Sequence, residues 1–203
     1  MYYSTIRKYD VANGPGVRVS LFVSGCDHHC KGCFQPETWN PEYGKIFDKE
    51  AEKEIMDYLS EPQVDGITLL GGDPLYKDNI INVYFLINTI RKTFGDSKSI
   101  WLYTGYRYEE IVNEIINLPP KTVELEFLHD IMMNIDVLVD GRFEEDKKDL
   151  KLQFRGSSNQ RLIDVKKSMN YIGSELKIYH KNKIEDKTYT LTIKESNKDG
   201  YFD

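Results

Sequence analysis

Hydrophobic residues are distributed along the chain in two kinds of segment. Some form short runs of neighbouring apolar residues, a pattern typical of strands, and each of these runs ends at a turn that contains glycine. We predict four strands from these runs: Arg18–Val23, Gly66–Leu70, Ile100–Tyr103 and Val137–Val139.

In the second kind of segment, apolar residues recur every three or four positions, which predicts amphipathic helices between the strands. We expect three of them: Asp48–Glu61, Asp78–Phe94 and Tyr106–Leu118. Asp48 is placed to cap the first helix, Gly95 to end the second, and Pro119–Pro120 to stop the third.

Strands that alternate with helices of this length imply right-handed crossovers and a parallel sheet. We therefore predict an α/β fold, a partial (β/α) barrel of mostly parallel strands. The turns after such strands meet at the carboxyl edge of the sheet, where proteins of this class place their chemistry.

The pattern changes near the C-terminus. The segments LKIYH and TYTLTIK alternate apolar and polar residues, as expected of an antiparallel hairpin. We therefore assign residues 1–170 to the main domain and residues 171–203 to a small C-terminal β-rich extension.

Composition narrows the class of protein. Of 203 residues, 40% are hydrophobic and 12% aromatic, as in an ordinary globular chain, and a net charge of −6 gives no basic field for nucleic acid. The N-terminus has no apolar signal segment, and no apolar run approaches the length of a membrane span. We expect a cytoplasmic protein with neither a nucleic-acid nor a membrane partner.

The chain has three cysteines, and all lie within one turn region: Cys26, Cys30 and Cys33. An odd number of thiols in a reducing compartment argues against a disulfide framework. Thiols gathered in this way, with none elsewhere, indicate metal ligands.

Two kinds of metal site fit this spacing. Structural zinc needs four ligands, and the fourth would come from one of the histidines His28, His29, His129 or His180. We expect His28 and His29 to be solvated loop residues. Three thiolates also suit a cubane iron–sulfur cluster with one iron left open, and this is the alternative we favour.

The motif Cys-x3-Cys-x2-Cys with Phe34 after it, directly following a first strand, resembles the signature of the radical S-adenosylmethionine enzymes. Gly71-Gly72-Asp73-Pro74 resembles their GGEP-type motif, although alone it would indicate only a strand-ending turn. Segments 13–18, 21–26, 101–106, 137–143 and 155–160 narrow the resemblance to the anaerobic ribonucleoside-triphosphate reductase-activating proteins. The resemblance covers about residues 1–165.

This resemblance implies a 4Fe-4S cluster on Cys26, Cys30 and Cys33, whose fourth iron chelates S-adenosylmethionine. It implies an oxidoreductase that forms a 5′-deoxyadenosyl radical and generates a glycyl radical on the large subunit of the reductase. The electron would come from a small donor protein such as flavodoxin or ferredoxin. No side chain is expected to act as a catalytic acid or base, because the cofactors carry the chemistry.

The resemblance and the strand-end turns together suggest a set of cofactor-binding residues: Gly32, Cys33, Phe34, Gly71, Gly72, Asp73, Thr104 and Asp140. Gly72, at a strand end facing the cluster, is expected to leave little room for a Cβ. Arg18 is expected to be exposed at the start of its strand. A radical enzyme acting on a small molecule and a zinc-stabilised binding module are the alternative functions.

Overall fold

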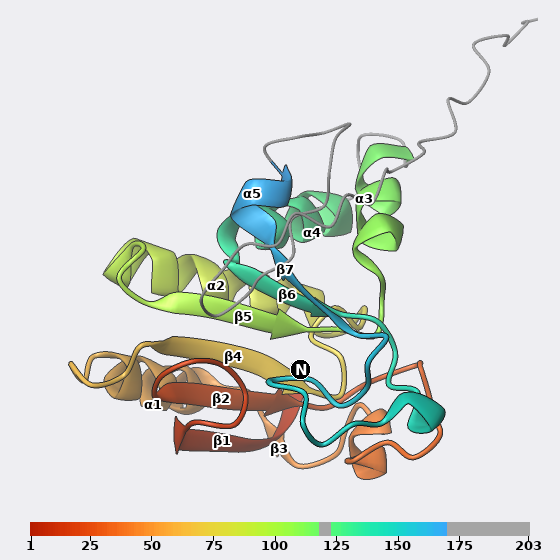
Figure 1. The fold of residues 1–203 in the computed structure, drawn as a ribbon. Helices are drawn as coiled ribbons and strands as arrows, with labels where there is room; N and C mark the ends of the chain where they lie inside the picture. The colour runs from red at the N-terminus through yellow and green to blue at the C-terminus, as the bar shows by residue number, and fades with distance from the viewer. Residues whose placement is uncertain (118–122, 170–203) are drawn as a thin grey trace, which may run out of the picture.

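The computed structural model describes residues 1–117 and 123–169, whose strands form one mixed sheet (Figure 1). The strand order is β3-β1-β2-β4-β5-β6-β7. The strands are β1 Tyr2–Asp10, β2 Arg18–Val23, β3 Lys45–Ile46, β4 Gly66–Gly71, β5 Ser99–Tyr103, β6 Val137–Asp140 and β7 Arg161–Asp164.

The centre of this sheet is parallel and its two sides are antiparallel. Strands β2, β4, β5 and β6 pair in parallel, whereas β1, β3 and β7 are antiparallel to their neighbours. The four predicted strands are these four central ones, so the α/β class is confirmed. The edge strands were not predicted, and the sheet as a whole is mixed.

Register across the centre follows from the apolar runs. Four leucines, one from each parallel strand, lie in a single row and are fully buried: Leu21, Leu69, Leu102 and Leu138. A row of this kind aligns the carboxyl ends of the four strands at one edge. The turns that carry the cysteine and glycine motifs are thereby brought together.

Helices pack against the sheet and bury its apolar side chains (Figure 1). They are α1 Lys49–Leu59, α2 Ile80–Phe94, α3 Tyr108–Asn117, α4 Val123–Asn134 and α5 Val165–Met169, with short 3-10 helices η1 Pro36–Trp39 and η2 Glu145–Lys147. The predicted caps of the first two are confirmed, because the Asp48 carboxylate accepts a 3.0 Å hydrogen bond from the Ala51 N–H and Gly95 ends α2 with φ 57°. Helix α4 was not predicted.

Two predictions lie outside the described residues, namely the proline stop at Pro119–Pro120 and the hairpin of residues 171–203 with its domain boundary. Within the described parts of the chain, none of the helices is long and apolar enough to span a membrane.

The prediction that Arg18 is exposed was wrong. Its side chain is fully buried, and its guanidinium donates to the Thr68 hydroxyl at 2.7 Å and to the Ile67 carbonyl at 2.6 Å. It also donates to the Ser99 hydroxyl at 2.8 Å and lies over the Trp101 ring. A buried charge is tolerated where hydrogen bonds replace its hydration, and the acceptors here come from β4 and β5, far from Arg18 in the sequence.

Candidate cofactor site

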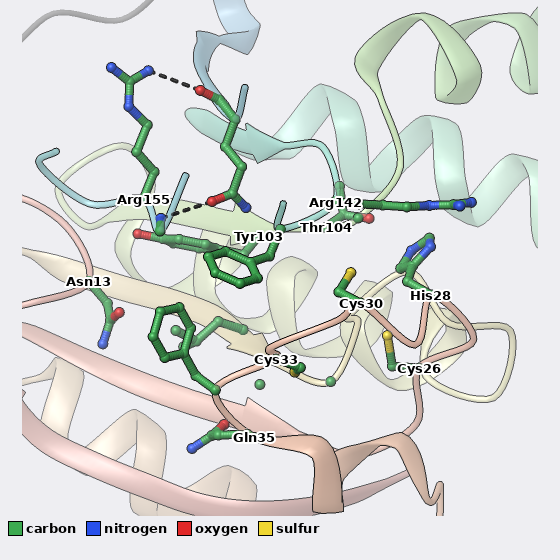
Figure 2. A pocket seen from close by; sticks show the side chains of 18 of the residues that line it. Asn13, Cys26, His28, Cys30, Cys33, Gln35, Tyr103, Thr104, Arg142 and Arg155 are labelled. Atoms are coloured by element: carbon green, nitrogen blue, oxygen red, sulfur yellow. Dashed lines mark hydrogen bonds between the residues drawn. The ribbon is translucent and has the colours of Figure 1, made fainter. Parts of the chain in front are cut away.

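A cavity of about 580 Å³ lies at the carboxyl edge of the four parallel strands. Its wall includes the loop after β2, the end of β4, the turn after β5 and the turn after β6 (Figure 2). This volume is within the usual range for sites that bind small molecules and cofactors. The cavity occupies the edge that the sequence predicted.

The three cysteines lie on the loop after β2, and all three line this cavity (Figure 2). Each is a free thiol. Burial raises the pKa of the Cys26 thiol to about 11 and also raises that of Cys30, although the Phe143 N–H and the Arg142 charge oppose the second shift. Both thiols are therefore protonated near neutral pH without metal, and binding of a metal would release protons.

The arrangement of these thiols fits a cluster better than zinc. In the part of the chain that the structure describes, no three Cys, His, Asp or Glu side chains converge closely enough to hold a metal ion. A single zinc needs donors about 2.0–2.3 Å from one point. A cubane accepts each thiolate at a different iron, so it needs three thiolates that line one cavity, as these do, and not three that meet at one point.

Gly71 and Gly72 bring the end of β4 against the backbone of the cysteine loop. A Cβ on Gly71, which has φ 110°, would lie 2.6 Å from the Val23 carbonyl oxygen, and one on Gly72 would lie 2.6 Å from the Gly25 carbonyl oxygen. The Gly72 N–H donates to the Val23 carbonyl at 2.7 Å. Both glycines line the cavity. Gly72 has little room for a Cβ, as expected, and the group in the way is the backbone of the cysteine loop.

Asp73 connects three of the strand-end turns. Its Oδ2 accepts hydrogen bonds from the Thr104 hydroxyl at 2.9 Å and the Gly105 N–H at 3.0 Å, and it lies 2.7 Å from His28 Nε2. Its Oδ1 accepts from the Leu75 N–H at 2.8 Å. This carboxylate is almost fully buried and does not line the cavity. Asp73 therefore holds the wall together through protein donors.

His28 is not the solvated residue that we expected. Its side chain is only 5% exposed, bonded to Asp73 and packed edge-on against the Tyr106 ring. It also covers Gly105, where a Cβ would lie 2.2 Å from the imidazole. His29, in contrast, is exposed as expected. Because His28 lies between Cys26 and Cys30, its bond to Asp73 fixes the cysteine loop against β4 and β5.

Asp140 supports the wall from behind. Its carboxylate is fully buried, accepts from the Tyr108 N–H at 2.8 Å and binds the Arg161 guanidinium. Arg161 also makes a two-pronged pair with Glu109 at 2.8 and 2.6 Å. Burial opposes the charge on Arg161, but these two carboxylates raise its pKa. Asp140 does not line the cavity, although Gly141, next to it, does.

The structure thus separates the predicted site residues into two groups. Seven of them line the cavity together: Cys26, Cys30, Cys33, Phe34, Gly71, Gly72 and Thr104. Gly32, Asp73 and Asp140 do not line it.

Sequence reasoning missed the three arginines of the cavity wall, Arg7, Arg142 and Arg155. Arg142 and Arg155 fall in segments that carried the family resemblance. Nothing in the local sequence of Arg7 marks it, because it lies in an edge strand that we did not predict.

Comparisons with known proteins agree with this site. A family model described as a 4Fe-4S single cluster domain matches residues 12–163. The anaerobic ribonucleoside-triphosphate reductase-activating protein of Enterobacteria phage T4 is 40% identical over 162 residues, which cover 80% of this chain and 93% of the phage protein. Proteins of the same name from Escherichia coli (strain K12) and Vibrio cholerae serotype O1 are 38% and 39% identical, each match covering 79% of this chain and 96% of the relative.

Proposed function

The chain belongs to the family of anaerobic ribonucleoside-triphosphate reductase-activating proteins, and from this premise we propose that it activates such a reductase by generating a glycyl radical on it. It is a radical S-adenosylmethionine enzyme with a 4Fe-4S cluster. When bound, the cluster and S-adenosylmethionine supply a 5′-deoxyadenosyl radical that removes hydrogen from a glycine Cα of the reductase.

The observation that carries this proposal is the placement of three thiols and two glycines around one cavity. Cys26, Cys30 and Cys33 would hold three irons, and the backbone of Gly71 and Gly72 offers polar groups beside them for the methionine end of S-adenosylmethionine. Phe34 lines the same cavity and offers a flat apolar face. Each of these side chains or backbone groups would bind or orient the cluster or S-adenosylmethionine, and none has to transfer a proton.

Thr104 and Asp140 have different parts in this proposal. Thr104 lines the cavity, but its hydroxyl is bonded to Asp73, so it would contact a ribose only through the oxygen lone pairs. Asp140 and Asp73, whose carboxylates are held by protein donors, position the wall. Gly32, with φ 72°, allows the turn between Cys30 and Cys33.

The names of the relatives imply the reductase as partner. We further propose that a small protein such as flavodoxin or ferredoxin supplies the electron. Cys30 and Cys33 are half-buried whereas Cys26 is buried, so the cluster would approach the surface on the side of Cys30 and Cys33. We also propose that the fold is a partial barrel, as predicted from the sequence. Its parallel strands would be β2, β4, β5 and β6.

The test uses anaerobically reconstituted protein with dithionite. We expect release of 5′-deoxyadenosine without the reductase, and a glycyl radical detected by electron paramagnetic resonance when the family's reductase is added. After prolonged exposure to air, both should be lost, because an open iron is accessible to oxidants. Deoxyadenosine without any protein radical would favour a small-molecule substrate, and a zinc content with neither product would favour the binding module.

A further inference from the structure

Residues 148–156, which we call the rim loop, form one wall of the cavity and are anchored at their base. Lys148 and Ser157 form an antiparallel bridge, and the Asp149 N–H donates to the Gly156 carbonyl at 3.3 Å. These backbone bonds hold the loop in a hairpin-like shape beside the turn after β6.

The far end of the rim loop is anchored as well. The Tyr103 hydroxyl donates to the Phe154 carbonyl at 2.7 Å, and the Phe154 ring packs edge-on against Trp101 with centroids 5.5 Å apart. Phe154 also adopts φ 59°, a left-handed conformation that is unfavourable for a bulky residue. Such strain persists where the surrounding structure fixes it, and it is concentrated at functional sites.

The anchored rim loop presents an apolar face to the cavity. Leu150, Leu152 and Phe154 alternate along the loop and all three line the cavity. Leu150 is 87% exposed, which is the largest exposure of any large hydrophobic residue in the described parts of the chain. An exposed leucine held at the mouth of a cavity, beside Phe34 at 63% exposure, indicates a surface that another molecule covers.

The loop between β1 and β2 contributes further to the cavity wall and is also preformed. Ala12 and Asn13 line the cavity. The buried Asp10 carboxylate holds both, accepting from the Ala12 N–H at 2.8 Å and from the Asn13 side chain at 2.6 Å. In Figure 2, Asn13 lies at the left of the view and Gln35 at the bottom, whereas Arg142 lies at the right.

The cavity is cationic although the chain is acidic. Arg7, Arg142 and Arg155 line it, and the one carboxylate that lines it among the described residues belongs to Asp149. The Arg155 Nε is buried and has no hydrogen-bond partner within the described residues. The guanidinium of Arg155 is held by a 3.0 Å hydrogen bond from its Nη1 to the Gln160 carbonyl. Arginines are hydrogen-bond donors only, so a cavity lined by three of them favours a ligand that brings oxygen acceptors, such as peptide carbonyls.

We infer that the rim loop is the docking element for the glycine-bearing segment of the reductase, an inference that rests on the function proposed above. The hydrogen to be removed is on a main-chain Cα, so a stretch of polypeptide must enter the cavity. An extended segment that enters the cavity would lay its side chains against Leu150, Leu152 and Phe154, which line it from successive turns of the rim loop. Its carbonyl groups meet the arginines.

The test compares Leu150→Ala with Phe85→Ala. Phe85 is 57% exposed on α2 and does not line the cavity, so it controls for loss of an exposed apolar side chain. With Leu150→Ala, we expect the reductase concentration for half-maximal glycyl-radical yield to rise about tenfold, the effect of truncating an anchor residue at an interface. Deoxyadenosine release without reductase, iron content and the urea midpoint should equal those of the wild type.

Other results would overturn the inference. An unchanged half-maximal concentration in Leu150→Ala, or an equal change in Phe85→Ala, would show that the rim loop does not dock the partner. Loss of deoxyadenosine release without reductase would place Leu150 in the cofactor site instead. If the wild type yields deoxyadenosine but no radical on the reductase, it is the proposed function that fails.

A photo-crosslink identifies the occupant directly. We would place p-benzoylphenylalanine at position 150, with position 85 as the control, and irradiate the complex of each variant with the reductase. A crosslinked peptide that includes or adjoins the radical-bearing glycine supports the inference. Crosslinks only to remote reductase peptides, or to this chain's own residues 170–203, contradict it.

Discussion

The two walls of the cavity are built in opposite ways. The inner wall is formed by the turns after β2, β4 and β5 and is held together from behind by the Asp73 carboxylate. This carboxylate is almost fully buried and both of its oxygens are bonded, with His28 and Thr104 among its partners. On the rim loop, Leu150 is 87% exposed, and the Arg155 Nε is a buried donor without a partner within the described residues. The polar groups of the inner wall already have hydrogen-bond partners, whereas the rim loop has apolar surface and a donor that no described residue covers or pairs.

This difference assigns a role to each wall. Satisfied buried polar groups fix one geometry, as is needed where a cluster and a cofactor must be held in register. Exposed apolar surface and an open donor gain free energy only when something binds. Substitutions on the inner wall should therefore change cluster binding and stability, whereas substitutions on the rim should change activation of the reductase alone.

The largest effect should come from removing a thiol. In Cys30→Ala, one iron would lose its protein ligand, and we expect most of the iron and all cleavage of S-adenosylmethionine to be lost. Iron and sulfide analysis after anaerobic reconstitution, together with deoxyadenosine release, measures this. Full cleavage activity in the variant would show that the three thiols do not act as one ligand set.

A second, smaller effect should follow from loosening the inner wall without touching a ligand. His28→Ala removes a hydrogen bond to the buried Asp73 carboxylate and the cover over Gly105, so we expect a loss of about 1–3 kcal/mol in the free energy of unfolding and lower iron content. His29→Ala is the matched control: its ring is exposed and has a tilted contact with the Trp39 ring at 4.7 Å, so its removal should lower the stability by no more than about 1 kcal/mol and leave the iron content unchanged.

Equal urea midpoints and equal iron content in the two histidine variants would contradict the role of His28. The comparison is sharp because the two substitutions remove the same side chain from adjacent positions of the same loop. A His28→Gln variant, which retains a hydrogen-bond donor, should recover part of the lost iron content.

Truncation of the C-terminal residues tests whether the cofactor chemistry and the activation of the reductase can be separated. A chain that ends at Asn170 keeps every residue named in the cavity wall, so we expect it to bind the cluster and release deoxyadenosine at the normal rate. Activation of the reductase should weaken, because the hairpin predicted for residues 171–203 would be marginal on its own and is expected to dock on the partner. Paired measurement of deoxyadenosine and glycyl radical decides this, and loss of cluster binding would overturn the boundary at residue 170.

The smallest effect concerns the charges behind the wall. Burial tends to raise the pKa of Glu109, but its hydrogen bonds with Arg161 outweigh this and lower the pKa below the usual value. A carboxylate with a lowered folded-state pKa stabilises the protein above its unfolded pKa, and this contribution disappears as the pH falls through the folded value. The wild type should therefore lose more stability on acidification than Glu109→Gln.

We expect this difference to be under about 1 kcal/mol, because Glu109 is partly exposed and Arg161 keeps Asp140 as a partner. Urea midpoints of the two proteins, measured between about pH 6 and pH 3 where carboxylates titrate, give the result. Parallel curves would show that the Glu109–Arg161 pair contributes nothing measurable.

Sequence patterns predicted the centre of the fold well, and for a physical reason. A strand of the parallel centre is buried on both faces and therefore mostly apolar, so β4 was visible as the run Gly66–Leu70, with Thr68 as its one polar side chain. Strand β1 was missed because one of its faces is exposed and carries Arg7 among other polar residues. Its burial depends on partners that a local pattern does not contain.

The candidate site shows the same limit. The cysteine spacing is local and could be recognised, whereas the hydrogen bond between His28 and Asp73 joins residues 45 positions apart. A histidine in a loop is usually solvated, and only the folded sheet brings this one to its acceptor. Arg18 is the parallel case, since its acceptors lie on β4 and β5.

The bond between His28 and Asp73 also sets an order of events during biogenesis. The cysteine loop reaches its final shape only when β2, β4 and β5 have aligned, because Asp73 takes donors from all three regions. Contacts between distant parts of the chain form late in folding, after the entropy of closing the intervening segments has been lost. We therefore expect the three thiols to be presented together only once the sheet has folded, so that the folded chain is the form that takes up iron and sulfide.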